Sequence, residues 1–70
     1  MKKVWKINVS GENGYSFAVA GELEDEAAAM YEAVECGLFN DERDARYATV
    51  EDITDDEDEL NAFKDETVRV

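Results

Sequence analysis

The sequence predicts an α+β fold, in which an N-terminal β-hairpin and one amphipathic helix pack on a small antiparallel sheet of three to four strands. Three observations predict it. Two runs of alternating apolar and polar residues flank a Gly/Asn turn, a run of helical period follows, and strand-forming residues recur later in the chain. A chain of 70 residues accommodates a single domain, spanning 1–70.

The hairpin is predicted by segments 4–10 and 15–20, which flank two glycines and an asparagine. In a half-buried strand, alternate side chains face the core. The side chains expected to face inward are those of Trp5, Ile7, Val9, Tyr15, Phe17 and Val19. On the second strand, those expected to face outward are Ser16, Ala18 and Ala20.

A helix is predicted between Glu24 and Cys36, because apolar residues recur there at i, i+3, i+4 and i+7. Acidic residues crowd its start, where the helix dipole favours carboxylates, and Gly37 suits the position after its end. The face expected to cover the sheet consists of Ala27, Met30, Tyr31 and Val34.

Further elements are predicted in the last third of the chain. Segment 46–53 is rich in β-branched and aromatic residues, which are typical of a third strand. Thr54 and Glu57 fit a capping box and predict a short second helix, for which an acidic loop over 55–59 is the alternative. The alternation at 68–70 predicts a fourth strand at an edge of the sheet.

Charge is the most informative feature of the composition. The chain has 19 acidic residues, 7 basic residues and no histidine, which gives a formal net charge of −12. No basic residue occurs between Ile7 and Glu42, where there are nine acids, or between Tyr47 and Phe63, where there are seven. This charge disfavours direct binding to nucleic acid or to an anionic membrane. No segment approaches the roughly 18 apolar residues of a membrane helix, so the cytoplasm is the expected location.

No arrangement typical of catalysis or of cofactor binding is found. A nucleophilic Ser or Cys normally needs a neighbouring base, most often a histidine, which this chain lacks. Cys36 alone can close no internal disulfide, and one cysteine leaves too few ligands for zinc. The acidic stretch 52–59 does not fit the spacing of a calcium-binding EF-hand loop. We therefore expect a non-enzymatic protein without cofactor or metal.

The acids admit three interpretations. They could be a solvated coat on a small housekeeping module, an adaptation of such a module to high salt, or a mimic of nucleic acid. An antitoxin or another partner-dependent subunit is a further class compatible with the composition. In the mimic, helical carboxylates at one per ~1.5 Å approach the spacing of one charge per ~1.7 Å in duplex DNA.

The candidate partner-binding residues form two patches that could lie on one side of the molecule. They are Glu22, Glu24, Asp25, Glu26, Asp52, Asp55, Asp56, Glu57, Asp58 and Glu59. Exposed ion pairs are individually weak, so tight binding would also need apolar anchors among the acids. The candidate anchors are Tyr15, Tyr31, Phe39 and Tyr47.

In size, charge and layout, the chain resembles the small acidic proteins that phages and mobile elements encode against bacterial defence, notably anti-CRISPR proteins and other DNA mimics. The base-free stretches around 22–26 and 52–59 carry this likeness, and no specific motif is shared. The resemblance implies a non-enzymatic inhibitor that occupies the DNA- or PAM-binding groove of a CRISPR effector in the bacterial host cell. Lys2, Lys3 and Lys6 depart from a uniformly acidic surface and indicate that one sheet edge lies outside the interface.

Overall fold

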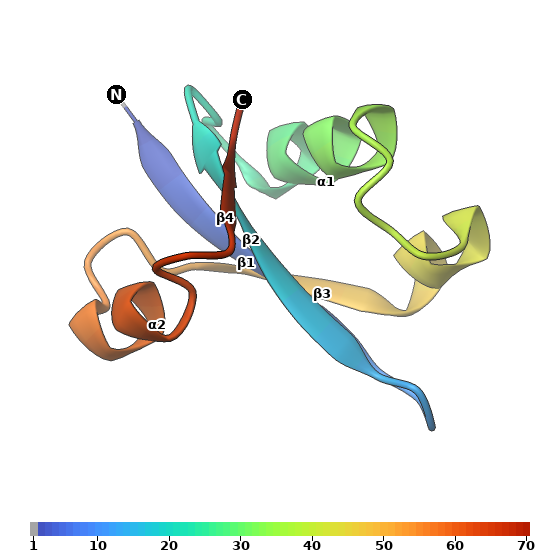
Figure 1. Cartoon of the computed structure of the whole chain (residues 1–70). Helices are drawn as coiled ribbons and strands as arrows, with labels where there is room; N and C mark the ends of the chain where they lie inside the picture. The colour runs from blue at the N-terminus through green and yellow to red at the C-terminus, as the bar shows by residue number, and fades with distance from the viewer. Residues whose placement is uncertain (1) are drawn as a thin grey trace.

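The computed structural model describes residues 2–70 and has a four-stranded sheet with helices on both of its faces (Figure 1). The strands lie in the order β3-β1-β2-β4. In chain order the elements are β1 (Lys3–Val9), β2 (Tyr15–Gly21), α1 (Glu26–Glu35), the 3₁₀ helix η1 (Glu42–Tyr47), β3 (Ala48–Asp52), α2 (Glu57–Ala62) and β4 (Thr67–Arg69). The α+β class, the hairpin and the second helix predicted from the sequence are confirmed.

The hairpin has the register that its alternating pattern predicts. Strands β1 and β2 are antiparallel, with Trp5 opposite Val19 and Ile7 opposite Phe17, so these four side chains share one face of the sheet. In the turn, Gly11 adopts a φ of +133°, a backbone conformation that residues with a Cβ rarely adopt. The two central strands therefore present one continuous apolar surface.

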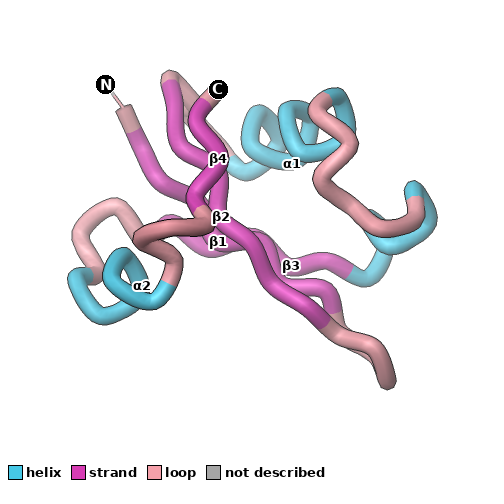
Figure 2. The backbone as a smooth tube through the Cα atoms, in the orientation of Figure 1, coloured by secondary structure: helices cyan, strands magenta, loops and turns pink. Residues whose placement is uncertain are grey.

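The sheet is mixed, and not wholly antiparallel as expected. Strand β3 pairs antiparallel with β1, but β4 pairs parallel with β2. Parallel strands need a crossover connection, and here segment 53–66 crosses one face of the sheet from the β3 edge to the β4 edge, with α2 in its middle (Figure 2). The route of this crossover, which the local sequence pattern does not specify, sets the direction of the last strand.

Helix α1 packs closely on the Trp5 face of the sheet through small side chains. Ala29 and Ala33 are fully buried and join Trp5, Ile7, Val19 and Leu23 in the main core. The indole Nε1 of Trp5 donates a hydrogen bond of 2.9 Å to the carbonyl of Leu23, which fixes the ring beside the chain that leads into the helix. Because large side chains already fill this layer, alanines let the helix approach the sheet.

The helix face predicted to cover the sheet was therefore wrong. Tyr31 is 62% exposed and Val34 is 46% exposed, while Ala27 is exposed and Met30 is half-buried. Apolar residues occupy both sides of this helix, and it is the side with Ala29 and Ala33 that is buried. In the structure the two buried alanines lie on the opposite side of the helix from Tyr31.

The second face of the sheet has a smaller core of its own. Ala18 is fully buried together with Ile53 and Phe63, and Ala20 is only 6% exposed. Ala18 and Ala20 had been expected to face outward, and this was wrong because the crossover segment covers their side of β2. The cap of α2 is also displaced from the predicted Thr54, since it is Asp56 that accepts a hydrogen bond from the backbone amide of Glu59.

The orientation of α1 can be tested by placing one charge on each of its faces. We expect Ala33→Glu to lower the free energy of unfolding by at least about 2 kcal/mol, since it puts a charge and extra volume into the core. Ala27→Glu should change it by less than about 0.5 kcal/mol. Urea denaturation followed by tryptophan fluorescence measures both. The opposite ranking would restore the helix face predicted from the sequence.

Candidate functional site

The acidic cluster at α2 consists of Asp52 and the carboxylates at 55–59, and it begins where β3 ends. Its carboxylates at 55–58 are all exposed. Asp52 accepts hydrogen bonds from the Thr54 backbone amide (3.0 Å) and from Thr54 Oγ1 (2.6 Å), and these bonds lower the pKa of Asp52. Asp56 caps the helix, as described above. Two of the predicted site residues thus have local structural roles in shaping the turn and the start of α2.

Lysines of β1 neutralise part of this cluster. The Nζ atom of Lys6 lies 2.9 Å from Oε2 of Glu59, and Nζ of Lys3 lies 3.8 Å from Oδ2 of Asp52. The bond to Glu59 raises the pKa of Lys6, although burial of the ammonium group opposes the shift. Within the described residues, three carboxylates of this cluster neither pair with a base nor cap a helix. They are those of Asp55, Glu57 and Asp58.

The second cluster leads into α1. Glu22, Glu24, Asp25 and Glu26 are all exposed. The side chain of Asp25 accepts a hydrogen bond of 2.9 Å from the backbone amide of Ala28 and is the N-cap of the helix. Glu26 lies in the first turn, where the helix dipole favours a carboxylate.

The two clusters lie on different faces of the sheet, so the sequence-based arrangement with both on one side was wrong. Each begins near the N-terminal end of β1, since Gly21 is opposite Lys3 and Asp52 is opposite Trp5. However, α1 belongs to the main core on one face, and α2 belongs to the smaller core on the other (Figure 1). A flat partner surface laid on one face of the sheet therefore meets only one of the two helices.

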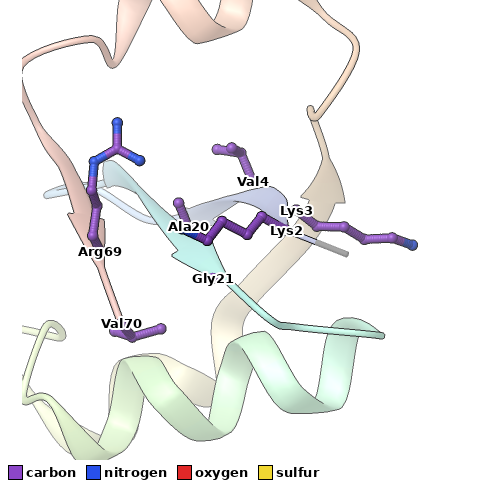
Figure 3. Close-up of a pocket in the computed structure, with 7 residues that line it drawn as sticks. All are labelled: Lys2, Lys3, Val4, Ala20, Gly21, Arg69 and Val70. Atoms are coloured by element: carbon purple, nitrogen blue, oxygen red, sulfur yellow. The ribbon is translucent and has the colours of Figure 1, made fainter.

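Basic residues gather at the same end of the sheet. A shallow pocket is lined there by Lys2, Lys3 and Arg69 together with Val4, Ala20, Gly21 and Val70. The side chains of Lys3 and Arg69 point away from each other (Figure 3), so these two do not converge on a common anion position. The basic residues at this end border the acidic clusters, since Lys3 pairs with Asp52 and the charge of Lys2 helps to lower the pKa of Glu22.

Two of the four candidate aromatic anchors serve internal packing. The Tyr15 hydroxyl donates to Asp44 (2.7 Å) and accepts from the Asn40 amide (2.8 Å), and burial together with Asp44 raises the pKa of this tyrosine. Phe39 packs edge-on against Phe17 at 5.3 Å between ring centroids. The other two, Tyr31 and Tyr47, are 62% and 63% exposed.

The pair formed by Asp41 and Arg43 was not anticipated from the sequence. Asp41 caps η1 through the Arg43 amide and also binds the Arg43 guanidinium, with distances of 3.2 Å to Nε and 2.9 Å to Nη2. These bonds lower the pKa of Asp41 to about 2. The spacing Asp-x-Arg at a helix start is the signal that could have indicated it. The carboxylate of Asp41 thus neutralises the positive charge of Arg43.

Within residues 2–70, no group of three His, Cys, Asp or Glu side chains is arranged to hold a metal ion. Cys36 is exposed and unpaired at the C-cap of α1. None of the helices described is both long and apolar enough to cross a bilayer. No family model, curated protein or solved structure matches this chain.

The Asp41–Arg43 pair predicts a pH effect whose sign follows from the lowered pKa. The ionised carboxylate should stabilise the fold above its ordinary pKa of about 3.9, and this stabilisation should be lost as the pH falls through about 2. In Arg43→Ala, the Asp41 midpoint measured by NMR titration of the carboxyl carbon should move up toward the ordinary value. An unchanged midpoint would mean that Arg43 does not hold the carboxylate in solution.

The acidic coat also predicts that salt stabilises the fold. Repulsion between exposed carboxylates opposes compaction, and raising the salt from about 20 to about 300 mM shortens the Debye length from about 20 to about 6 Å. Thermal melts at the two concentrations should show a higher Tm in the higher salt. A lower Tm would mean that the ion pairs made by Lys3, Lys6 and Arg43 outweigh the repulsion.

Proposed function

We propose that this protein is a non-enzymatic inhibitor of a nucleic-acid-binding protein, either a CRISPR effector or a similar defence protein. It binds the basic groove of its target and presents carboxylates there in place of DNA phosphates. The observation that carries the proposal is the exposure of acids on both helices, among which, within the described residues 2–70, an ion pair is seen for Glu59. Such an inhibitor acts in the cytoplasm of the bacterial host cell, where its target works.

The local charge density supports the comparison with DNA. The carboxylates of Glu57 and Asp58, unpaired within the described residues, are consecutive at the start of helix α2, so they are spaced along its axis at ~1.5 Å per residue. Duplex DNA has one charge per ~1.7 Å. Asp55 precedes the helix in a turn and is also exposed, so the acidic surface extends beyond the helix end.

The charge acts mainly on encounter and the choice of partner. A groove lined with Lys and Arg attracts a chain of net charge −12 over long distances, and such steering accelerates association. Once the surfaces meet, each exposed ion pair adds little. Several carboxylates must therefore face the groove together, so binding depends on where they lie. This dependence on position separates the proposal from a purely solubilising role, in which every acid is equivalent.

Paired charge reversals test the proposal by position. We compare Glu24→Lys/Glu26→Lys at α1, Asp55→Lys/Asp58→Lys at α2, and Glu12→Lys/Glu66→Lys as a control outside both clusters. Each variant changes the net charge by the same amount, and none alters the capping residues Asp25 and Asp56. The assay is displacement of a labelled target duplex from each of a panel of purified CRISPR effector–guide RNA complexes.

The wild type should displace DNA from at least one effector, less effectively as salt rises. At least one of the two cluster variants should lose about tenfold or more in apparent affinity, a change of about 1.4 kcal/mol. The control should stay within about twofold. Equal small losses in all three variants, or no displacement from any effector by the wild type, would leave the acids as a solubilising coat.

A further inference from the structure

We propose that the outward side of α1 is a docking surface for a partner protein that offers an apolar side chain ringed by Lys and Arg. This surface, the α1 apolar face, consists of Ala27, Met30, Tyr31 and Val34. The inference rests on the proposed function in that it identifies the side of the molecule on which the target is bound. Its first test does not require the target to bind nucleic acid.

The exposure of this face departs from the usual behaviour of an amphipathic helix. Tyr31 is two residues from each of the buried alanines 29 and 33, about 200° around the helix from either. The helix therefore buries methyl groups and exposes a phenol ring, an isopropyl group and part of a thioether chain. Departures from a local rule are expected at functional surfaces, and tyrosine is enriched among the residues that dominate binding energy.

The face continues into a hollow at the C-terminal end of α1. Val34, Gly37, Phe39 and Glu42 line this hollow, whose volume is about 80 Å³. Gly37 has a φ of +66° and no side chain to fill the space, and Phe39 is held in place by its edge contact with Phe17. The hollow has room for the end of one apolar side chain of a partner.

Charge determines which partner fits. Glu26 and Glu35 lie one turn from Met30 and Tyr31, and Glu42 lines the hollow, so carboxylates border the apolar face. No base occurs between Ile7 and Glu42, and the adjacent Arg43 is bound by Asp41. A second copy of the chain would bring the same acids against each other and is disfavoured. A partner with a basic rim gains from each of these carboxylates while its apolar group covers the ring of Tyr31.

Two peptides of about 18 residues serve as probes in the first test. One is an amphipathic helix with leucines on one side and lysines on the other, and its control has the same lysines with serine in place of each leucine. Each is titrated into the ¹⁵N-labelled full chain at about 150 mM salt. The leucine peptide should bind at least about tenfold more tightly and should shift the amides of 27–39 in preference to those of α2.

Matched variants assign this preference to side chains. Tyr31→Ser/Val34→Ser should abolish the tenfold preference for leucine. The control Tyr47→Ser/Val70→Ser should keep it, although it removes a tyrosine and a valine of the same exposure, 63% and 45%. Thermal melts of both variants should match the wild type, since all four side chains are exposed. Equal binding of the two peptides, shifts centred on α2, absence of binding, or equal losses in the two variants would overturn the inference.

The same variants in the effector displacement assay separate the two proposals. If the leucine peptide binds the α1 apolar face but no effector releases its DNA, the docking surface stands and the proposed function fails. If DNA is released equally by wild type and by Tyr31→Ser/Val34→Ser, the proposed function stands and the docking surface is not where the target binds. Loss of DNA release in that variant but not in the Tyr47→Ser/Val70→Ser control, while release by the wild type weakens as salt rises, supports both.

Discussion

The alternation of side chains along β1 is the constraint on which the rest of the structure depends. As a central strand, β1 pairs with β2 on one side and β3 on the other, and both of its faces are used. Trp5 and Ile7 point into the main core beneath α1. On the other face, Lys6 extends past the ring of Phe63, 5.9 Å from the ring centroid, to reach Glu59. A single strand thus positions the helix that carries the apolar face and connects the sheet to the helix with the densest acids.

Two of the three lysines near the N-terminus, Lys3 and Lys6, are explained by this arrangement. The partly exposed pairs of Lys3 and Lys6 contribute little stability individually. These pairs do hold segment 52–59, whose carboxylates repel one another, against the sheet. The aliphatic part of the Lys6 side chain covers apolar surface at the same time. As a result Glu59 and Asp52 are engaged within the chain. The acids left to meet a partner are fewer than the composition suggests, and their positions are fixed by caps and turns.

Local periodicity was enough to predict the hairpin and α1, because each depends on neighbours in sequence. The second helix was predicted from a capping box at Thr54, with an acidic loop as the alternative, and its cap is Asp56 instead. It could not predict which face of α1 is buried, since alanine is compatible with either side and the helix meets a layer already filled by Trp5, Ile7 and Leu23. It could not predict that Ala18 is covered, because α2 reaches β2 from a distant part of the chain. The exposure of most candidate acids was predictable from their polarity, whereas Glu59 is half-buried beside Lys6. Their division between two faces was not, because it follows from the path of the crossover.

The acidic coat and the α1 apolar face are best understood together. An exposed tyrosine and valine beside a half-buried methionine would ordinarily favour self-association. Here the carboxylates of Glu26, Glu35 and Glu42 surround them, so two copies that brought these faces together would also bring together six negative charges. The same charges that disfavour this pairing are attractive to a basic partner, so one property provides both solubility and selectivity. The helix can therefore keep its larger apolar residues exposed, and these residues remain available to contact a partner surface of opposite charge.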